Sequence, residues 1–187
     1  MALASHICFT RNLALSTLIA FALTIGLFTA PASADLGAAA NSVPAASLVG
    51  KGRMTVFGFK VFDAELYAPG GSYSPSKPFA LKLTYLRKFK GVAIAEQSVK
   101  EIRKQGRASE SQIERWTQDM KAIFPNVSPG QSITGVRTAQ GGTLFYLDNR
   151  KIGSINDPAF SKSFFSIWLG NRTRNSQLRA QLVGAGS

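Results

Sequence analysis

The stretch LVGKGRMTVFGFKVFDAELYAP, residues 48–69, carries the first strong structural signal in this chain of 187 residues. Its aromatic, aliphatic and β-branched residues favour strands, and its glycines are placed where such a chain would bend. The expected bends are Gly50, Gly52 and Gly58. Four charged side chains are threaded through the stretch: Arg53, Lys60, Asp63 and Glu65. We therefore predict a pair of strands, and ask which of these charges faces solvent and which reaches a site.

Residues 1–34 are typical of a secretory signal. Arg11 supplies a positive start, residues 13–28 form an uncharged apolar run, and Ala32-Ser33-Ala34 offers the small residues that a signal peptidase requires. The apolar run, about 16 residues long, is shorter than the roughly 20 residues that a membrane-spanning helix needs. We therefore expect cleavage after Ala34 and a periplasmic or secreted protein; a retained membrane anchor is the alternative.

Cleavage would leave one domain without cysteine or histidine. We expect a flexible leader over residues 35–46, which are mostly small, and a folded domain over residues 47–187 that is long enough for its own core. Cys8 and His6, the single cysteine and histidine of the chain, both lie in the signal. The domain therefore cannot use thiol chemistry, a Ser-His-Asp triad or a histidine metal site. We expect no metal and no cofactor.

The domain is strongly basic. All ten acidic residues and 21 of the 22 basic residues follow residue 34, which leaves a net charge of +11. Such a balance favours anionic partners, although we expect no nucleic acid partner for an exported protein. Four basic residues share a predicted helix face: Lys100, Arg103, Lys104 and Arg107. This face fits either peripheral contact with an anionic membrane surface or simple solvation.

Later segments alternate between runs of strands and runs of helices. A strand is predicted over residues 79–88, and two amphipathic helices follow over 91–106 and 109–125. The predicted buried positions of the helices are Val92, Ala95, Val99 and Ile102, then Ile113, Trp116, Met120 and Ile123 or Phe124. Two patterns at the start of the second helix fit a capping box: Ser109 with Gln112, and Ser111 with Glu114.

Strands return over residues 131–156, and two more helices end the chain. In the helix predicted over residues 157–170, Asp157 is the expected N-cap, Pro158 takes the first turn and Gly170 ends it. Segregated runs of strands and helices predict an α+β domain with helices on one face of an antiparallel sheet.

Four segments, taken in this order, resemble the chalcone isomerase-like family, and most closely its bacterial exported branch. They are LVGKGRM…FKVFDAELYAP, PFALKLTYLRKFKGVAIAEQSVKEI, GTLFYLDNRKIGSINDPAFSKSFFSIWLG and LRAQLVG. The resemblance implies an open-faced β-sandwich, in which a helical layer covers one face of an antiparallel sheet and ligand lies between the two layers. The family includes enzymes that close chalcones to flavanones and relatives that bind fatty acids without catalysis.

The resemblance also implies which residues line the ligand site. Arg53 falls where the family's arginine meets the negative charge of the ligand, and a planar guanidinium can hold a carboxylate through two hydrogen bonds. Its alternative role is to pair with an acid of the protein or to reach solvent. The family's other polar site positions fall on Phe62, Ile94, Glu101 and Ile167.

Because most of those positions are apolar here, we expect no catalytic residue. The interpretation we favour is a non-catalytic binder of a small amphipathic acid, such as a fatty acid. One alternative is an isomerase, an intramolecular lyase acting on a chalcone-like or other unsaturated ketone. The other is a structural or interaction protein whose sheet–helix gap is filled by side chains. If Arg53 holds the ligand carboxylate, Arg53→Ala should weaken binding roughly tenfold to a hundredfold.

Overall fold

The computed structural model describes residues 36–184, so the predicted signal lies outside the described residues. The six strands are β1 (Ala46–Val56), β2 (Phe59–Pro69), β3 (Phe79–Tyr85), β4 (Ser132–Arg137), β5 (Thr143–Leu147) and β6 (Arg150–Ile155). The helices are the 3₁₀ helix η1 (Gly37–Ser42), then α1 (Gly91–Lys104), α2 (Glu110–Ile123), α3 (Pro158–Leu169) and α4 (Ser176–Val183). None of the helices within residues 36–184 is long and apolar enough to cross a membrane.

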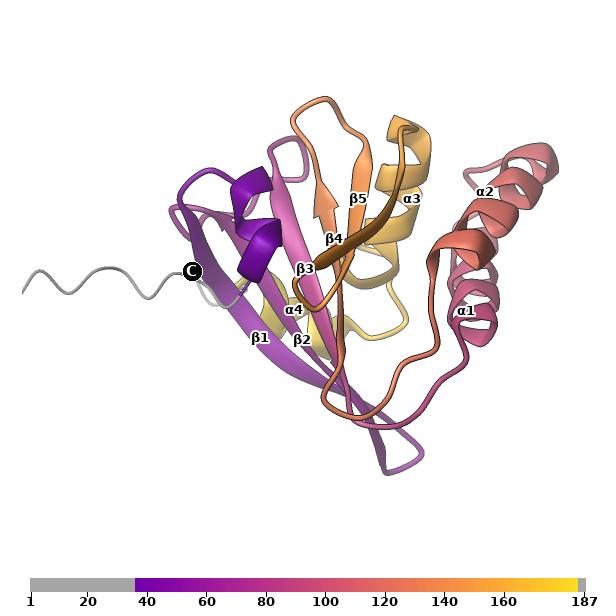
Figure 1. Ribbon diagram of the computed structural model, residues 1–187, viewed down its shortest axis with the longest axis horizontal. Coiled ribbons are helices and arrows are strands. Elements are labelled where there is room, and N and C mark those ends of the chain that lie inside the picture. The colour runs from indigo at the N-terminus through magenta and orange to yellow at the C-terminus, as the bar shows by residue number, and fades with distance from the viewer. Residues whose placement is uncertain (1–35, 185–187) are drawn as a thin grey trace, which may run out of the picture.

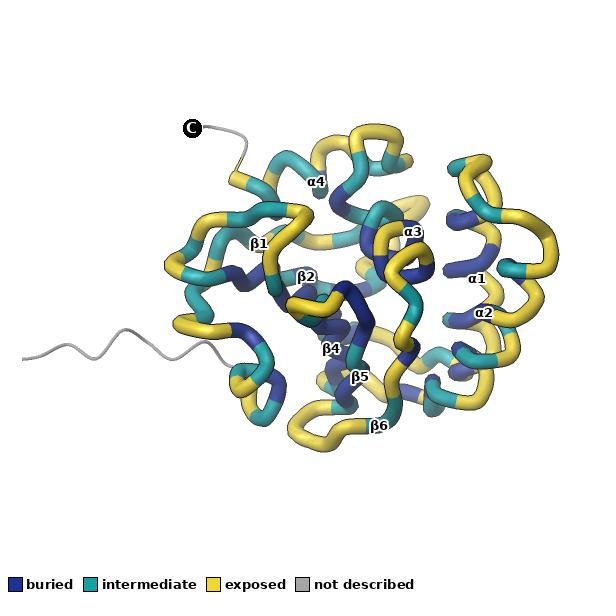
Figure 2. The backbone as a smooth tube through the Cα atoms, turned by 90° about the horizontal axis from the view of Figure 1, so that it is seen from above, coloured by how far each residue is buried: buried dark blue, intermediate teal, exposed yellow. Residues whose placement is uncertain are grey.

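The strands form one antiparallel sheet in chain order, β1 to β6. Figure 1 shows α1, α2 and α3 on one side of this sheet and η1 on the other, and Figure 2 shows the buried backbone concentrated between the layers. The predicted α+β arrangement, with a helical layer on one face of an antiparallel sheet, is confirmed. Side chains alternate between the two faces of the sheet along β2, and those on one face are apolar and must be covered. Phe62, Ala64, Leu66 and Ala68 face the helices and are buried.

The segment expected to be a flexible leader is instead part of the fold. Leu36, Ala39 and Val43 are almost completely buried and join Tyr67 and Tyr146 in a small apolar cluster on the second face of the sheet. The expectation rested on the small residues of this segment, yet small residues are what allow a 3₁₀ turn to lie close against a sheet. The strand that follows begins at Ala46, one residue before the expected start of the folded domain at residue 47.

Gly50 and Gly52 lie within β1, where both allow close packing, and Gly50 also stands at a register shift of the strand. A Cβ at Gly50 would lie 2.1 Å from the carbonyl oxygen of Gln181, and a Cβ at Gly52 would lie 2.7 Å from Leu178 Cδ1. Both contacts are with α4, which therefore rests directly on β1. Gly58, whose φ is +79°, does form the turn between β1 and β2.

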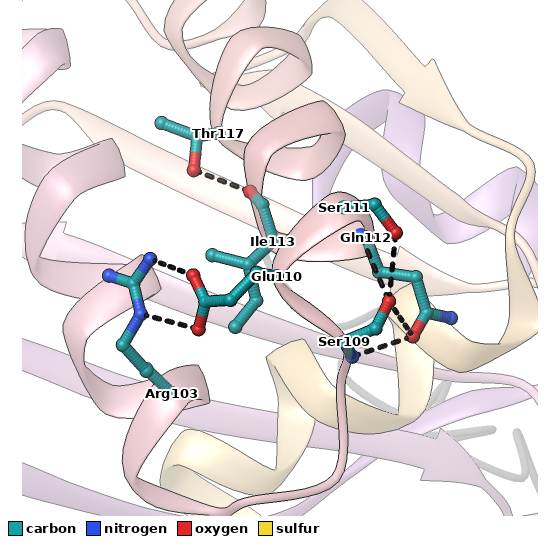
Figure 3. Close-up of polar contacts among 7 residues, drawn as sticks. All are labelled: Arg103, Ser109, Glu110, Ser111, Gln112, Ile113 and Thr117. Atoms are coloured by element: carbon teal, nitrogen blue, oxygen red, sulfur yellow. Dashed lines mark hydrogen bonds and ion pairs between the residues drawn. The ribbon is translucent and has the colours of Figure 1, made fainter.

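The helical periodicities are confirmed except at one position. Ala95, Val99 and Ile102 of α1 are buried as predicted, but Val92 is 48% exposed. At the start of α2 the Ser109–Gln112 pair forms the capping box. Gln112 N–H donates to Ser109 Oγ at 3.3 Å, and Ser109 N–H donates to Gln112 Oε1 at 3.0 Å (Figure 3).

Asp157 joins two helices of the covering layer. One carboxylate oxygen, Oδ1, accepts from the backbone N–H of Ala159 and Phe160 and so caps α3, as predicted. The other, Oδ2, accepts from Trp116 Nε1 of α2 at 2.9 Å. Burial raises the pKa of this carboxyl, but the hydrogen bonds from Trp116, Phe160 and Ala159 outweigh burial and hold the pKa below its ordinary value.

We expect Asp157→Ala to lower the free energy of unfolding by about 2–4 kcal/mol, because it removes an N-cap and leaves the buried indole N–H of Trp116 without an acceptor. Asp157→Asn keeps one of the two acceptor oxygens, which can cap α3 or accept from Trp116 but not both, so it should cost less than alanine. The lowered pKa means that the charge of Asp157 stabilises the fold above its unfolded pKa, and that this contribution is lost as pH falls through the folded pKa. Urea unfolding of the three proteins at neutral and acidic pH, followed by tryptophan fluorescence, measures both effects. A parent-to-Asn difference that does not shrink toward low pH would contradict the charge assignment.

Candidate functional site

A cavity of about 580 Å³ lies where the β1–β2 end of the sheet meets the helical layer. Strand β1, strand β2, helix α1, helix α3 and the segment leading into α4 each contribute to its wall. The lining side chains are mostly apolar near the sheet and polar at the rim: Met54, Thr55, Val56, Phe57, Val61, Phe62, Gln97, Ser98, Glu101, Ile167, Trp168, Thr173, Arg174, Asn175 and Leu178. Its volume falls within the range of about 300–1,000 Å³ that is usual for small-molecule sites.

Aromatic packing explains why the gap is open here and closed farther along the sheet. Near β4 and β5 the ring of Phe164 lies 5.3 Å from that of Phe145 and 5.4 Å from that of Phe160. The ring of Phe165 packs directly on β4 at Gly135. A Cβ on this glycine would lie 3.2 Å from the ring. Toward β1 and β2 the aromatic contacts reach Trp168, 5.3 Å from Phe164, and Phe62, 6.1 Å from Tyr85, but Ile167 and Trp168 remain only half-buried beside the cavity.

Glu101 is the carboxylate of the cavity wall, and three neighbours hold it. It accepts from Gln97 Nε2 at 3.0 Å and from Lys104 Nζ at 2.9 Å. Arg174 Nη1 lies farther away, 3.6 Å from the same oxygen, and its side chain is 72% exposed. Arg174 is therefore the most loosely held cation of this group, and the other two partners would still satisfy Glu101 if Arg174 turned elsewhere.

The other polar groups of the rim bond to the protein itself. Ser98 Oγ donates to the carbonyl oxygen of Ile94, and Thr173 Oγ1 donates to that of Ile167. Asn175 Nδ2 donates to Met54 Sδ at 3.2 Å, while its Oδ1 caps α4. These groups fix the chain around the rim, and they leave Arg174 as the side chain best placed to meet a charged ligand.

Three of the five residues named from the sequence come together in this cavity. Phe62, Glu101 and Ile167 all line it, from β2, α1 and α3 respectively. Ile94 lies one helical turn before Ser98 and packs half-buried against the apolar core, and it does not line the cavity.

Arg53 lies on the opposite face of the sheet. It is the cross-strand partner of Asp63, and both side chains point away from the helical layer. Its guanidinium donates two hydrogen bonds to the Asp63 carboxylate, at 2.5 and 2.9 Å. The hydrogen bond from Arg53 lowers the pKa of Asp63, and the same bond raises the pKa of Arg53. The structure thus gives Arg53 the partner named as its alternative, an acid of the protein.

The basic face of α1 is also partly neutralised. Arg103 makes a two-point ion pair with Glu110 of α2, with its Nη2 2.7 Å from Oε2 (Figure 3). Lys104 is paired with Glu101. These contacts favour the simpler of the two interpretations of this face, in which its charges are solvated and pair with neighbouring acids.

Sequence reasoning missed Arg174 and most of the rim. The relevant signal was the polar run NRTRNS between Gly170 and the last helix, which places two arginines and two amides at a helix-to-helix connection. Nothing in the run itself shows that it reaches β1. That contact follows from the close seating of α4 on Gly50 and Gly52.

In a comparison with protein families, the family described as chalcone isomerase-like matches residues 42–184. The chain belongs to the chalcone isomerase-like family. A relative from Haemophilus influenzae, described as an uncharacterized protein, is 26% identical over 137 residues, which cover 73% of this chain and 67% of the relative.

A solved structure shares the fold of this chalcone isomerase-like chain. The crystal structure of a fatty-acid binding protein from Arabidopsis thaliana superposes with a TM-score of 0.58, at 13% sequence identity, over 75% of this chain and 88% of the other. At this level of identity the likeness concerns the fold alone. It agrees with the α+β architecture derived above.

A filled cavity should exclude an amphipathic probe. We expect Ile167→Trp to reduce binding of the anionic dye 1-anilinonaphthalene-8-sulfonate at least tenfold, because the larger ring occupies space between β2 and α3. Arg53→Ala, on the other face, should leave dye affinity unchanged. Fluorescence titration of parent and both variants measures this, with thermal melts to confirm folding. If Arg53 instead contacts ligand, as the family resemblance implied, Arg53→Ala should weaken binding roughly tenfold to a hundredfold.

Proposed function

We propose that this protein is a non-catalytic binder of a small amphipathic acid, with a fatty acid as the best fit, and that it binds this ligand in the cavity between sheet and helices. The observation that carries the proposal is an apolar cavity with one loosely held arginine, Arg174, at its rim. The fatty-acid binding protein from Arabidopsis thaliana, which shares the fold, supports the same class of ligand.

The walls of the cavity suit a hydrocarbon chain. Met54, Val61, Phe62, Ile167 and Leu178 provide apolar surface from four separate elements. Burial of an acyl chain against such surface contributes roughly 0.8 kcal/mol per methylene group. A small-molecule site of this kind combines a mainly apolar wall with a few polar groups that fix orientation.

Arg174 would meet the carboxylate of the ligand. A largely exposed ion pair contributes little to stability, so transfer of Arg174 from Glu101 to a ligand carboxylate would cost little. Lys104 and Gln97 would continue to hold Glu101. Because the negative charge of Glu101 opposes that of the ligand, Glu101 would set a limit on affinity that a neutral residue would remove.

The open cavity also weighs against a structural protein with a filled core. Apolar residues at Phe62 and Ile167 weigh against an isomerase, because a cyclase needs hydrogen-bond donors where negative charge develops in the transition state. We therefore expect no chalcone cyclisation above the spontaneous rate. Stereospecific flavanone formation that depends on the protein would favour the isomerase instead.

Displacement of a fluorescent fatty acid by palmitate tests the site. We expect Arg174→Ala to weaken binding roughly tenfold, as for loss of one charge-assisted hydrogen bond. Arg172→Ala, an equal loss of charge two residues away, should have little effect. Glu101→Gln should strengthen binding, since it removes the opposing charge and releases Arg174. Equal affinity in the parent and a folded Arg174→Ala variant would exclude this arginine from the site.

We also propose that the protein acts after export, in the periplasm or outside the cell, because residues 1–34 have the features of a secretory signal. Protein isolated from its own host should begin at Asp35. N-terminal sequencing measures this directly. A chain that still carries the apolar run of residues 13–28 would instead be tethered to the membrane.

A further inference from the structure

The turn between β1 and β2 exposes a group of apolar side chains. Phe57 is 96% exposed, Phe59 60% and Val56 41%, and these are three of the five large hydrophobic residues that are exposed within residues 36–184. All three lie within four consecutive residues at one tip of the molecule, the lowest point of Figure 1. Exposed apolar groups gathered in one place commonly mark a surface that meets a partner.

The backbone of this turn makes its phenylalanine still more unusual. Val56 pairs with Phe59, which leaves Phe57 and Gly58 as the two turn residues, with φ of +48° and +79°. A two-residue turn with both φ values positive strongly favours Asn-Gly, and a bulky residue in this region is sterically disfavoured. At the comparable turn between β5 and β6 the chain uses Asp148, which tolerates its φ of +50°.

Phe57 therefore occupies a position that costs stability, while its side chain adds nothing to the core. A residue that is sterically disfavoured at its position and does not stabilise the core is typical of a functional site. Its side chain points into solvent at the end of a strand pair, where it is free to contact another surface.

Four exposed cations surround this tip. Lys60 follows the turn on β2, and Arg87, Lys88 and Lys90 lie in the connection from β3 to α1, at the same end of the sheet. The guanidinium carbon of Arg87 lies 4.9 Å from the centre of the Phe59 ring, so the two segments touch. The stretches 54–62 and 84–95 contain no acidic residue. Asp63, the acid next to the stretch 54–62, interacts with Lys60 but is already paired with Arg53. The tip thus combines exposed aromatic rings with an excess of positive charge.

We propose that the β1–β2 tip, with Phe57 at its apex and Lys60, Arg87, Lys88 and Lys90 around it, docks on the surface of an anionic lipid bilayer. Aromatic side chains enter the boundary between headgroups and acyl chains, and lysine and arginine remain at the level of the anionic headgroups. The basic side chains supply the selectivity for anionic lipid, and the phenylalanines supply the insertion.

Charge decides between a bilayer and a second copy of the chain. Two copies that meet through this tip would bring eight cations together with no acidic residue from the stretches 54–62 or 84–95 between them. An anionic bilayer offers the opposite charge and an apolar phase in the same place. The tip is therefore complementary to a membrane and not to itself.

Docking would also bring the cavity to the membrane. Val56 and Phe57 belong both to the tip and to the cavity lining, so the cavity opens beside the docking surface. This consequence, passage of a lipid-derived ligand between bilayer and cavity, rests on the proposed function. The docking itself does not, since it can be measured without any ligand.

Vesicle sedimentation of the proposed exported form of the chain, which begins at Asp35, tests the proposal. Vesicles contain phosphatidylcholine alone or an equal mixture with phosphatidylglycerol, and every variant begins at Asp35, so the apolar run of residues 13–28 is absent from all. We expect the parent to prefer the anionic vesicles and Phe57→Asn to bind them at least tenfold more weakly. Asparagine suits this turn, so the variant should melt at the same temperature as the parent or higher.

Matched variants separate local charge from net charge. Lys88→Gln should weaken binding to the anionic vesicles only, whereas Lys77→Gln, at the opposite end of the sheet, should have little effect. Because the chain has no cysteine after Cys8, an environment-sensitive dye on Phe57→Cys of the form that begins at Asp35 should report entry into the bilayer. The same dye on Gln140→Cys, in the turn between β4 and β5 at the other end, should remain in water.

Equal binding by the parent and Phe57→Asn would overturn the proposal, as would a dye response at position 140 equal to that at position 57. Reversible dimers that protect position 57 from the dye reagent, without vesicle binding, would assign the tip to self-association and also overturn it. Fatty-acid displacement without vesicles reads the cavity separately, so failure of docking and failure of the proposed function give different results.

Discussion

The packing of Phe164 against the sheet is the contact on which the rest of the structure depends. Its ring meets those of Phe124, Phe145, Phe160, Phe165 and Trp168, and so joins α3 to β5 and to the end of α2. One face of the sheet is apolar and must be covered, and this aromatic group sets how closely the cover can approach. Because the rings fill the gap near β4 and β5, the gap widens toward β1 and β2. The cavity is the space that this arrangement leaves.

The two faces of the sheet divide the polar residues into separate roles. Arg53 and Asp63 satisfy each other on the face that η1 shares, while Glu101, Lys104 and Arg174 form a looser group at the rim of the cavity. Side-chain alternation along a strand produces the division, since neighbouring positions point in opposite directions. Met54 reaches the cavity and Arg53 does not, although they are adjacent in the chain.

Much of the fold could be predicted because local chemistry and tertiary structure agree. The capping box at Ser109, the cap at Asp157 and the helical spacing of Ala95, Val99 and Ile102 each stand in the sequence and recur in the structure. The candidate site was harder to predict. Phe62, Glu101 and Ile167 were found through resemblance to a family, but a one-residue shift on β1 reverses the face of a side chain, and register shifts occur on β1 near Gly50 and Thr55.

The sequence by itself determined the class of fold, the order of its elements, the strong positive charge and the absence of histidine and cysteine after residue 8. Each of these depends on composition or on periodicity over a few residues. Tertiary structure alone decided that residues 36–43 cover the second face, that α4 rests on Gly50 and Gly52, and that Arg174 reaches the rim of the cavity. These contacts join segments that are far apart in the chain. They depend on how closely two elements can approach, which is a property of both surfaces together and of neither segment alone.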